Sequence, residues 1–387
     1  MKTKNGIQKY SILILGALLV LTYGCEKNEP VTPIVINPSH RVYTAISAGD
    51  DRSYALESDG TLWAWGFNIL GALGDSTYVN KSIPVKIGSG FIAISAGSFH
   101  TLALKADGIL WAWGYNLEGA LGDGTWDDKN YPVQVIGKDY IKISAGEGYS
   151  LAIKSDGTLW AWGSNFYSNL GDGSSENRNI PVQIGSGYTD IRAGSDHSLA
   201  IKSDITLWAW GSNNFGQLGD GTTIPRSHPA LVDSGYVQVA TGGAYSLGLK
   251  KDGLLWGWGF NFWGQLGDGT NTEKTQPTLI GPEYKSISTG DSYARISMGL
   301  KSDGTLWTWG DNTYGQLGDG TNVAKWSPIQ IGSEFTAAVS GTDHSLALKK
   351  DGTVWSWGDN TNGELGNGTF GNGINNEYYI PTQVKEN

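Results

Sequence analysis

Hydrophobic and polar residues alternate in short runs along most of this chain, and the runs recur with one long period. The clearest copy has runs at residues 140–146, 150–155, 158–163 and 181–184, here named strands a, b, c and d. Alternation of this kind predicts half-buried β-strands rather than helices. Asp156-Gly157 separates strands b and c, and Asp-Gly between alternating runs is a strong hairpin signal. Each copy therefore predicts four antiparallel strands.

Strand c of every copy contains the motif Trp-x-Trp-Gly. Its seven copies follow one another at steps of 48 to 51 residues, a regular period that indicates a repeat architecture. A period of two places both indoles on one face of the strand and the small middle residue on the other. The bulky face of one sheet can then fill the space beside the small-residue face of the next. We therefore assign fourteen tryptophans to the structural core: Trp63, Trp65, Trp111, Trp113, Trp160, Trp162, Trp208, Trp210, Trp256, Trp258, Trp307, Trp309, Trp355 and Trp357.

Seven four-stranded units without a helical pattern predict an all-β fold, a seven-bladed β-propeller of four-stranded antiparallel blades. A proline at the start of strand d in every copy predicts that this strand opens with proline near an outer edge. A linear solenoid is the alternative, but neither end of the chain has the polar cap repeat that an open stack requires. The propeller is expected over residues 42–387, with repeats that begin near residues 42, 91, 140, 188, 236, 284 and 335.

The N-terminal segment predicts export and anchoring. Residues 12–21 form an apolar run of ten, preceded by three lysines and followed by Thr22-Tyr23-Gly24-Cys25. The run is shorter than the ~20 residues that span a bilayer, but it suits a signal peptide. It resembles a bacterial lipoprotein signal, in which cleavage before the cysteine leaves Cys25 to carry lipid. We expect a signal peptide over residues 1–24, a flexible tether over 25–41, and an outer-membrane lipoprotein of a bacterial cell envelope, facing the periplasm or the surface. An ordinary signal peptide with an incidental cysteine is the alternative.

The net charge and the motifs of the chain limit the classes of function that the sequence supports. The net charge is -10, and without the three leader lysines 24 basic residues stand against 37 acidic ones, a balance of -13. Such a chain repels nucleic acid, so no nucleic-acid partner is expected. No nucleophile elbow, phosphate-binding loop or paired-cysteine motif is present in the sequence. We therefore expect no catalytic residue, no enzyme activity and no cofactor.

Two repeated features could suggest a metal site. Leu-Gly-Asp-Gly-Thr recurs at Asp123, Asp220, Asp268 and Asp319, but one carboxylate per repeat is far below the six to eight oxygens that calcium takes. Aspartate and glycine are common turn formers, which favours a structural turn. The position between strands a and b holds His100, His197 and His344 in three copies and tyrosine or arginine in others. We expect these side chains to bond to nearby backbone, and no metal site.

The a–b turns and c–d loops share one face of a propeller, whereas the Asp-Gly turns share the other. The Asp-Gly face is nearly uniform, and the variable loops on the opposite face are expected to carry recognition. Exposed aromatic residues on a rim commonly anchor protein or glycan ligands, although some can fold back over the blade ends. Repeat six also has a three-residue insertion on this rim. The candidate binding rim consists of Trp126, Trp326, Phe262, Trp263, Tyr167, Tyr314, Tyr293 and Arg295.

Several motifs resemble those of a known family. Residues 96–102 and 193–199, the Asp-Gly turns, Trp-x-Trp-Gly, and residues 213–222 (Asn-Asn-Phe-Gly-Gln-Leu-Gly-Asp-Gly-Thr) are similar to repeats of the regulator of chromosome condensation family, including alpha-tubulin-suppressor-like repeats. The resemblance implies a seven-bladed propeller, in agreement with the repeat count. It also implies guanine-nucleotide exchange on a small GTPase, but the family's exchange residues lie in nonrepeating loops and none can be placed here. Secreted β-lactamase inhibitors with this fold are a second precedent.

The leading interpretation is a non-catalytic, monomeric binding or scaffold propeller. Its partner would be an unidentified protein or polysaccharide, with membrane attachment through the N-terminal lipid. Three alternatives remain. They are a guanine-nucleotide-exchange-type regulator, a secreted enzyme inhibitor, and an envelope carbohydrate-active enzyme, which a pair of buried carboxylates in the central channel would favour.

Overall fold

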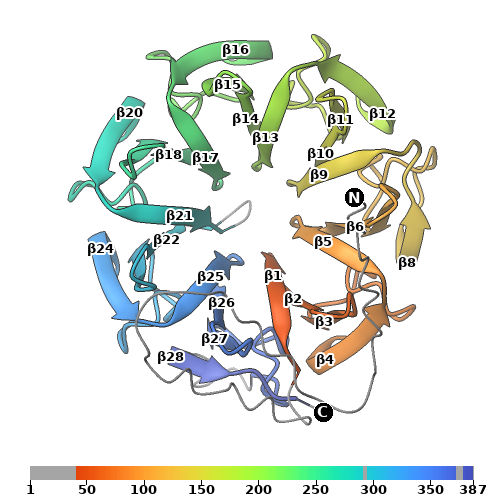
Figure 1. The fold of residues 1–387 in the computed structure, drawn as a ribbon, viewed down its shortest axis with the longest axis vertical. Helices are drawn as coiled ribbons and strands as arrows, with labels where there is room; N and C mark the ends of the chain where they lie inside the picture. The colour runs from red at the N-terminus through yellow and green to blue at the C-terminus, as the bar shows by residue number, and fades with distance from the viewer. Residues whose placement is uncertain (1–40, 291–293, 372–377, 387) are drawn as a thin grey trace, which may run out of the picture. The chain divides into compact units, whose positions relative to one another are not determined.

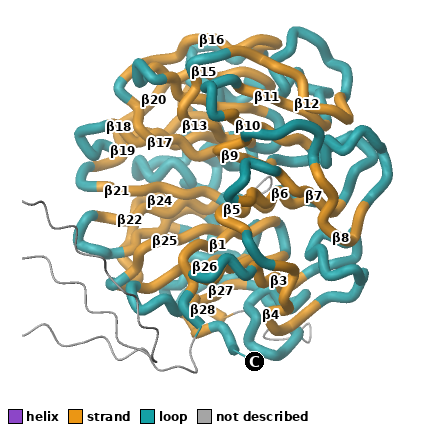
Figure 2. The backbone as a smooth tube through the Cα atoms, turned by 45° about the vertical axis from the view of Figure 1, so that its right-hand side comes forward, coloured by secondary structure: helices purple, strands orange, loops and turns teal. Residues whose placement is uncertain are grey.

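The computed structural model describes residues 41–290, 294–371 and 378–386. These residues form 28 strands in seven sheets of four, each sheet antiparallel and contiguous in sequence (Figure 1). The predicted seven-bladed β-propeller is confirmed. Figure 2 shows strands and loops throughout the described chain, and no helix there is long and apolar enough to cross a membrane.

The four strand positions are the same in every blade. The innermost strands, a, are β1 (Tyr43–Gly49), β5 (Phe91–Ala96), β9 (Tyr140–Ala145), β13 (Tyr188–Ala193), β17 (Tyr236–Thr241), β21 (Tyr284–Thr289) and β25 (Phe335–Ser340). Strands b are β2 (Arg52–Glu57), β6 (His100–Lys105), β10 (Tyr149–Lys154), β14 (His197–Lys202), β18 (Tyr245–Lys250), β22 (Ile296–Lys301) and β26 (His344–Lys349). Strands c are β3 (Leu62–Gly66), β7 (Leu110–Gly114), β11 (Leu159–Gly163), β15 (Thr206–Gly211), β19 (Leu255–Gly259), β23 (Leu306–Gly310) and β27 (Val354–Gly358). The outermost strands, d, are β4 (Lys81–Gly88), β8 (Lys129–Gln134), β12 (Arg178–Gly185), β16 (Arg226–Ser234), β20 (Lys274–Gly281), β24 (Lys325–Gly332) and β28 (Tyr378–Gln383).

The ring closes without strand exchange between the first blade and the last. All four strands of blade 1 precede those of blade 2, and β25 to β28 alone form blade 7. In Figure 1, β1 lies beside β25. Backbone hydrogen bonds join the two blades, from the Tyr43 N–H to the Gly352 carbonyl at 3.0 Å and from the Thr342 N–H to the Asp50 carbonyl at 3.1 Å. Closure therefore uses the same kind of side-by-side contact as the other blade interfaces.

The second tryptophan of each motif is fully buried and hydrogen-bonded across a blade interface. Trp162 donates through Nε1 to the Ala120 carbonyl of the preceding blade at 2.8 Å, and the Ser150 hydroxyl donates to the same carbonyl at 2.9 Å. A Cβ at Gly122 would lie 2.7 Å from Trp162 Nε1, so that loop position requires glycine. The same indole-to-carbonyl bond occurs at all seven interfaces, donated by Trp65, Trp113, Trp162, Trp210, Trp258, Trp309 and Trp357.

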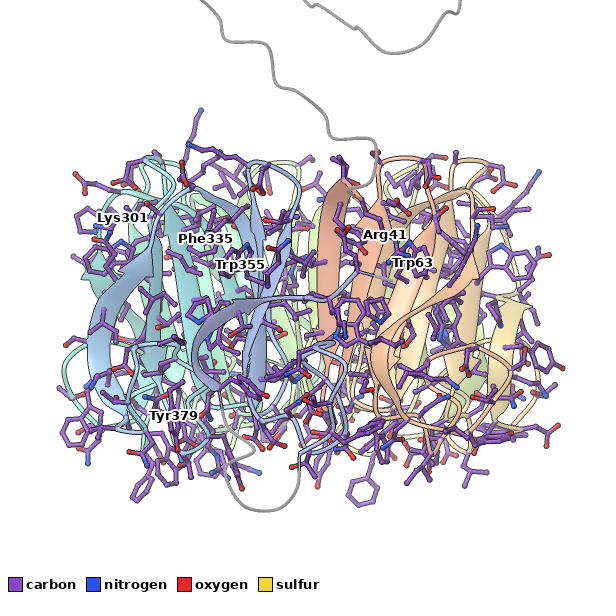
Figure 3. The ribbon with its side chains drawn as sticks, turned by 90° about the horizontal axis from the view of Figure 1, so that it is seen from below. Arg41, Trp63, Lys301, Phe335, Trp355 and Tyr379 are labelled. Carbon is purple, nitrogen blue, oxygen red and sulfur yellow. The ribbon has the colours of Figure 1, made fainter. Side chains whose placement is uncertain are left out.

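The first tryptophan of each motif is only half-buried and lies toward the Asp-Gly face. In six blades a lysine at the end of strand b stacks on it, as Lys154 does at 4.0 Å from the Trp160 ring. Blade 1 has Glu57 at the lysine position, and Glu57 accepts a 2.8 Å hydrogen bond from Trp63 Nε1. Arg41 supplies the cation instead, 3.6 Å from the Trp63 ring. Figure 3 shows Arg41 and Trp63 toward one face and Tyr379 toward the other.

The outer strands do not open with proline, so that prediction was wrong in detail. β4 begins at Lys81, and Pro84 is its fourth residue. The ladder pairs Gly66 with Lys81 and then Ala64 with Val85, so the proline lies in a bulge of the outer strand. A bulged edge position needs no ladder donor, which is why proline is tolerated there. 

We expect the buried and the half-buried tryptophan of one Trp-x-Trp-Gly motif to contribute differently to stability. Trp162→Ala removes a fully buried indole and its cross-blade hydrogen bond, so we expect the free energy of unfolding to fall by about 3–5 kcal/mol. Trp160→Ala, at a half-buried position of the same strand, is the matched control and should cost less. Urea unfolding followed by circular dichroism measures both. Equal losses would contradict the role given to the buried indole.

Candidate binding face

On the face opposite the Asp-Gly turns, one backbone hydrogen bond holds two variable residues in each blade. The N–H of the residue after Trp-x-Trp-Gly donates to the carbonyl of the residue before strand b, at 2.8 to 3.0 Å in all seven blades. The geometry repeats because strands b and c have the same register in every blade, as in Arg52 opposite Gly66. The backbone is therefore constant while the side chains differ. These paired positions are Asp51/Phe67, Phe99/Tyr115, Gly148/Ser164, Asp196/Ser212, Ala244/Phe260, Arg295/Asp311 and Asp343/Asp359.

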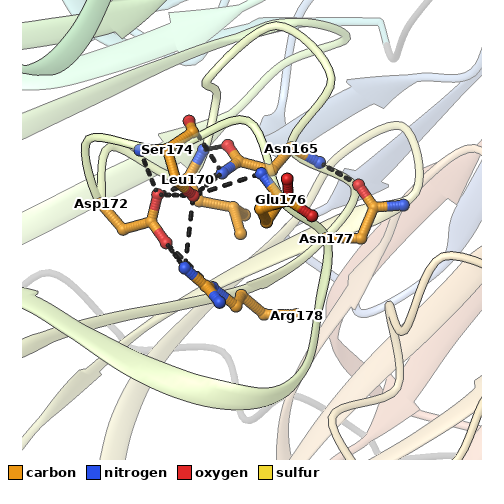
Figure 4. Close-up of polar contacts among 7 residues, drawn as sticks. All are labelled: Asn165, Leu170, Asp172, Ser174, Glu176, Asn177 and Arg178. Carbon is orange, nitrogen blue, oxygen red and sulfur yellow. Dashed lines mark hydrogen bonds and ion pairs between the residues drawn. The ribbon is translucent and has the colours of Figure 1, made fainter.

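The c–d loop is held by a polar network around its aspartate (Figure 4). In blade 3, Asp172 accepts hydrogen bonds from Asn165 Nδ2 at 3.1 Å and from the Ser174 hydroxyl at 2.8 Å, and it pairs with Arg178 at 2.8 Å. Although burial alone would raise the pKa of Asp172, these bonds lower it. The carboxylate is thus engaged within its own loop, as the structural-turn interpretation expects. Among the residues that the structure describes, no group of histidine, cysteine and carboxylate side chains suits a metal ion.

The tips of the c–d loops are apolar in four blades. The residue after the network asparagine is exposed by 60 to 76% in each of them, at Ile69, Leu117, Phe166 and Phe262. Blades 6 and 7 have Thr313 and Thr361 at this position. Exposed apolar side chains gathered on one face of a soluble protein commonly mark an interaction surface.

The structure brings together only some residues of the predicted rim. Phe262 and Trp263 meet edge to face with ring centroids 5.3 Å apart. Arg295, from the insertion in blade 6, lies 5.2 Å from the Trp263 ring and 4.0 Å from Asp311. Blades 5 and 6 therefore share a cluster that combines aromatic rings with one cation. 

The remaining rim residues lie apart from that cluster. Tyr167 packs edge to face on Phe166 in blade 3, and Tyr314 is partly exposed in blade 6. Trp126 lies in the c–d loop of blade 2, whereas Trp326 lies on β24 of blade 6, so these two tryptophans do not form one site. Trp326 packs over the neighbouring blade, where a Cβ at Gly264 would lie 2.4 Å from its ring. Tyr293 lies outside the described residues.

The histidines between strands a and b join neighbouring blades. His100, His197 and His344 are fully buried, and each Nε2 lies 2.7 to 2.9 Å from a serine hydroxyl of the next blade. The expected backbone contact is found for His344, which has a hydrogen bond with the backbone of Asp50, and for Tyr149, which donates to the His197 carbonyl of the next blade at 2.7 Å. It is wrong for His100 and His197, whose Nδ1 atoms have no hydrogen-bond partner among the described residues. Burial lowers the pKa of His100 and His197 to about 3 and that of His344 to about 4, so these rings are neutral.

An acidic cluster at the boundary of blades 7 and 1 was missed by sequence reasoning. Burial, reinforced by repulsion from Asp51, Asp311 and Asp359, raises the pKa of Asp343 to about 7. Burial also raises the pKa of Glu364 well above its ordinary value, and Asp359 adds to the shift. Asp343, Asp359 and Glu364 belong to repeat 7 and Asp51 to repeat 1, so only ring closure brings Asp51 close to the other three.

Glu364 occupies a position that is glutamine in the three preceding blades. Gln217, Gln265 and Gln316 each accept, through Oε1, the N–H of the residue two positions earlier, at 2.9 to 3.0 Å. Glu364 Oε2 accepts the Asn362 N–H in the same way at 2.7 Å, and its side chain is 1% exposed. A protonated Glu364 thus reproduces the glutamine geometry, and its raised pKa favours that form.

The central channel is lined mainly by small residues of the seven innermost strands. Its volume is about 450 Å³, and serine, threonine, alanine and isoleucine dominate the lining. Arg192 is the charged residue among the described lining side chains, and it pairs with Asp190 at 3.3 Å. The described lining holds no carboxylate, so it does not provide the buried pair that would favour a carbohydrate-active enzyme.

Comparison with known families identifies the class of protein. The RCC1-like domain family matches residues 20–299, and the regulator of chromosome condensation (RCC1) repeat matches residues 303–348 and 351–387. A second description of the same repeat matches residues 284–316 and 335–364. The chain therefore belongs to the RCC1-like family, as its motifs indicated. Comparison with curated protein sequences gave no significant match.

Solved structures agree on the fold. Human WBSCR16 is 22% identical with a TM-score of 0.74, covering 84% of this chain and 94% of that one. Prp20p from Saccharomyces cerevisiae, described with its binding to Gsp1p and histones, is 22% identical with a TM-score of 0.75, covering 90% and 88%. The ectodomain of the receptor kinase CR4 from Physcomitrella patens is 15% identical with a TM-score of 0.52, covering 82% and 74%. At these identities the likeness establishes the fold alone.

Glu364→Gln should stabilise the protein in a pH-dependent way. Because the pKa of Glu364 is raised on folding, the native state holds a proton that the unfolded state releases above about pH 4.5, and stability falls as pH rises from there toward the folded pKa. Glutamine keeps the Asn362 contact and cannot ionise. We expect no difference from wild type near pH 4 and a widening advantage toward pH 8, about 1.4 kcal/mol for each unit of the pKa rise.

Urea unfolding at several pH values measures this difference. Gln316→Glu is the matched control, since it introduces the same acid in the preceding blade and should create the opposite dependence on pH. Parallel stability profiles of wild type and Glu364→Gln from pH 5 to 8 would show that Glu364 is not protonated in the native state.

Proposed function

We propose that this protein is a non-catalytic binding propeller, tethered to a bacterial envelope by lipid on Cys25, whose variable face recognises a protein or polysaccharide. The observation that carries the proposal is the set of paired positions, where one backbone geometry presents different side chains in every blade. Loops that vary on a rigid scaffold are the usual carriers of recognition. The proposal assigns no catalytic residue, cofactor or metal.

A protein partner is supported by the chemistry of this face. Aromatic and arginine side chains are the commonest anchors of protein interfaces, and Phe262, Trp263 and Arg295 combine them at one place. Prp20p, which has a similar fold, binds the proteins Gsp1p and histones. A guanine-nucleotide-exchange-type regulator is the second candidate because of that relative, but export, as the N-terminal sequence predicts, would disfavour it.

The entry point of the chain favours an outward orientation of the variable face. Tyr43 bonds to Gly352 in the b–c turn of blade 7, and Arg41 stacks on Trp63, so the described chain begins on the Asp-Gly face. A tether from Cys25 would join the propeller there. The variable face, on the opposite side, would then point away from the membrane.

Lipid anchoring predicts a change of compartment on Cys25→Ser. We expect wild type in the detergent-soluble membrane fraction, labelled by a fatty-acid probe, because thiol lipidation requires this cysteine. The variant should be unlabelled and should leave the membrane fraction. Cys25→Ala is a second variant with the same expected result. Membrane retention of both unlabelled variants would refute the lipid anchor.

Recognition by the variable face predicts that loop-tip variants lose a partner. A partner captured from solubilised envelopes should bind Phe166→Ala/Phe262→Ala at least tenfold more weakly than wild type, a loss of at least about 1.4 kcal/mol, because both tips are exposed apolar anchors. Leu231→Ala/Ile380→Ala removes comparable exposed residues from outer strands and is the control. Calorimetry measures each affinity. Undiminished affinity of the tip variant would place the binding surface elsewhere.

A further inference from the structure

The variable face combines acidic residues near the channel mouth with apolar loop tips in four blades. The a–b turns of neighbouring blades contact each other around the channel mouth, through hydrogen bonds from the Glu147 N–H to the Gly194 carbonyl at 3.2 Å and from the Thr342 N–H to the Asp50 carbonyl at 3.1 Å. These turns and the adjoining loop starts place half-buried carboxylates in an arc through blades 7, 1, 2, 3 and 4. We call this arc the acidic mouth: Asp343, Asp359, Asp50, Asp51, Glu118, Glu147 and Asp196.

The carboxylates of the acidic mouth repel one another across blade boundaries. Burial and then Glu147 raise the pKa of Asp196 to about 6. Burial, with Asp51 and Glu147 adding to it, raises the pKa of Asp50 to about 6. Residues of blades 1, 3 and 4 therefore act on one another electrostatically. 

The two arginines at the ends of the a–b turns are committed to other contacts. Arg52 is 1% exposed and donates to the Gly97, Ser98 and His100 carbonyls at 2.5 to 3.0 Å. Arg295 is held by Trp263 and Asp311 at the outer side of blades 5 and 6. Neither guanidinium forms an ion pair with Asp51 or Asp343 among the described residues. Arg52 offsets part of the charge on Asp50 and Asp51, and Arg295 part of that on Asp343, but burial and the neighbouring carboxylates still raise the pKa of Asp50 to about 6 and that of Asp343 to about 7. An incoming cation would therefore favour the charged form of these carboxylates.

We propose that the variable face binds a protein segment that carries lysine or arginine flanked by apolar side chains. The cation enters the acidic mouth, and the flanking side chains rest on the exposed tips of Leu117, Phe166 and Phe262. Charge complementarity and exposed apolar area on one face support this occupant. The proposal rests on the proposed function and specifies its partner.

Other occupants fit the same face less well. A second copy of this chain docked face to face would bring two acidic mouths together, and like charges across an interface are unfavourable. An anionic polysaccharide meets the same repulsion. A neutral polysaccharide could stack on the aromatic tips but would leave the carboxylates uncompensated. A basic and apolar protein segment satisfies both parts of the surface.

The test uses the mature, unlipidated chain and three cyclic peptides that differ only at their centre. Each peptide carries Phe and Leu on both sides of a central pair, which is Lys-Arg, Gln-Gln or Glu-Asp. Fluorescence anisotropy of labelled peptides measures affinity. We expect the Lys-Arg peptide to bind at least tenfold more tightly than the Gln-Gln peptide, and the Glu-Asp peptide to bind most weakly. Raising the salt concentration from 50 to 300 mM should reduce this preference.

Charge-removing variants locate the cation. Asp51→Asn/Asp343→Asn/Asp359→Asn should lower affinity for the Lys-Arg peptide at least tenfold and leave the Gln-Gln peptide nearly unaffected. The control variant is Asp59→Asn/Asp107→Asn/Asp252→Asn, which removes the same number of charges from the Asp-Gly face. Asparagine also suits these turns, so the control should remain folded and bind the peptides as wild type does. Thermal melting checks that both triple variants are folded.

The possible outcomes separate this inference from the proposed function. Equal binding of the Lys-Arg and Gln-Gln peptides, or no binding of the Lys-Arg peptide up to millimolar concentration, would overturn the basic partner. Two other results would also overturn the basic partner when no preference for the Lys-Arg peptide is found. They are binding to soluble dextran, seen as retardation, and dimerisation, seen by sedimentation, if either is lost on substitution of Phe166 and Phe262. In those cases the capture experiment with the loop-tip variant still decides whether the face binds a partner. 

Discussion

The fold depends on one hydrogen bond, from the second tryptophan of each repeat to a carbonyl of the preceding blade. This bond satisfies the buried indole N–H, which would otherwise carry a desolvation cost. It also fixes the middle of the preceding c–d loop, because the carbonyl of Ala120 or its counterpart accepts from an indole and a hydroxyl together. The loop glycine at Gly122 follows from the same close approach, and the small residue Ala112 of the preceding blade lies in the core cluster that contains Trp162. One contact thus links the sequence motif, the blade interface and the position of the variable loops.

Blade 1 shows how the ring tolerates local exceptions. It has Arg52 in place of a histidine or tyrosine, and Glu57 in place of the stacked lysine. Arg52 still bridges to blade 2 through three carbonyls, and Arg41 restores a cation over Trp63. These replacements preserve the interaction while changing the residue that makes it.

Local patterns made the fold predictable, whereas grouping of residues in the site depends on the closed ring. Alternation, Asp-Gly turns and tryptophan spacing act within one repeat, and even Ile205 at the second turn position has the positive φ of 62° that the hairpin requires. The bulge at Pro84 was missed because a proline signals an edge strand without fixing where that strand begins. Trp126 and Trp326 fall in repeats two and six, so the repeat spacing already separated them, and grouping them on one face by residue type alone did not bring them into one site. The carboxylates of blades 7 and 1 meet only after closure, so Asp343 and Glu364 had no local signal beyond their departure from the other repeats.

The residues of blades 7 and 1 that differ from their counterparts in other repeats affect both stability and recognition. A half-buried carboxylate such as Asp343 destabilises the free propeller progressively as pH rises from its ordinary pKa of about 3.8 toward its raised pKa of about 7, because burial and neighbouring aspartates disfavour its charge. The seven indole-to-carbonyl bonds lie deeper in the blades and do not involve that side chain, so the scaffold retains its geometry despite the repulsion. A bound cation would relieve the repulsion among these carboxylates. The acidic mouth, which destabilises the free protein, would then contribute most to the choice of partner. The constant interior therefore permits an electrostatically strained surface on which specificity can be built.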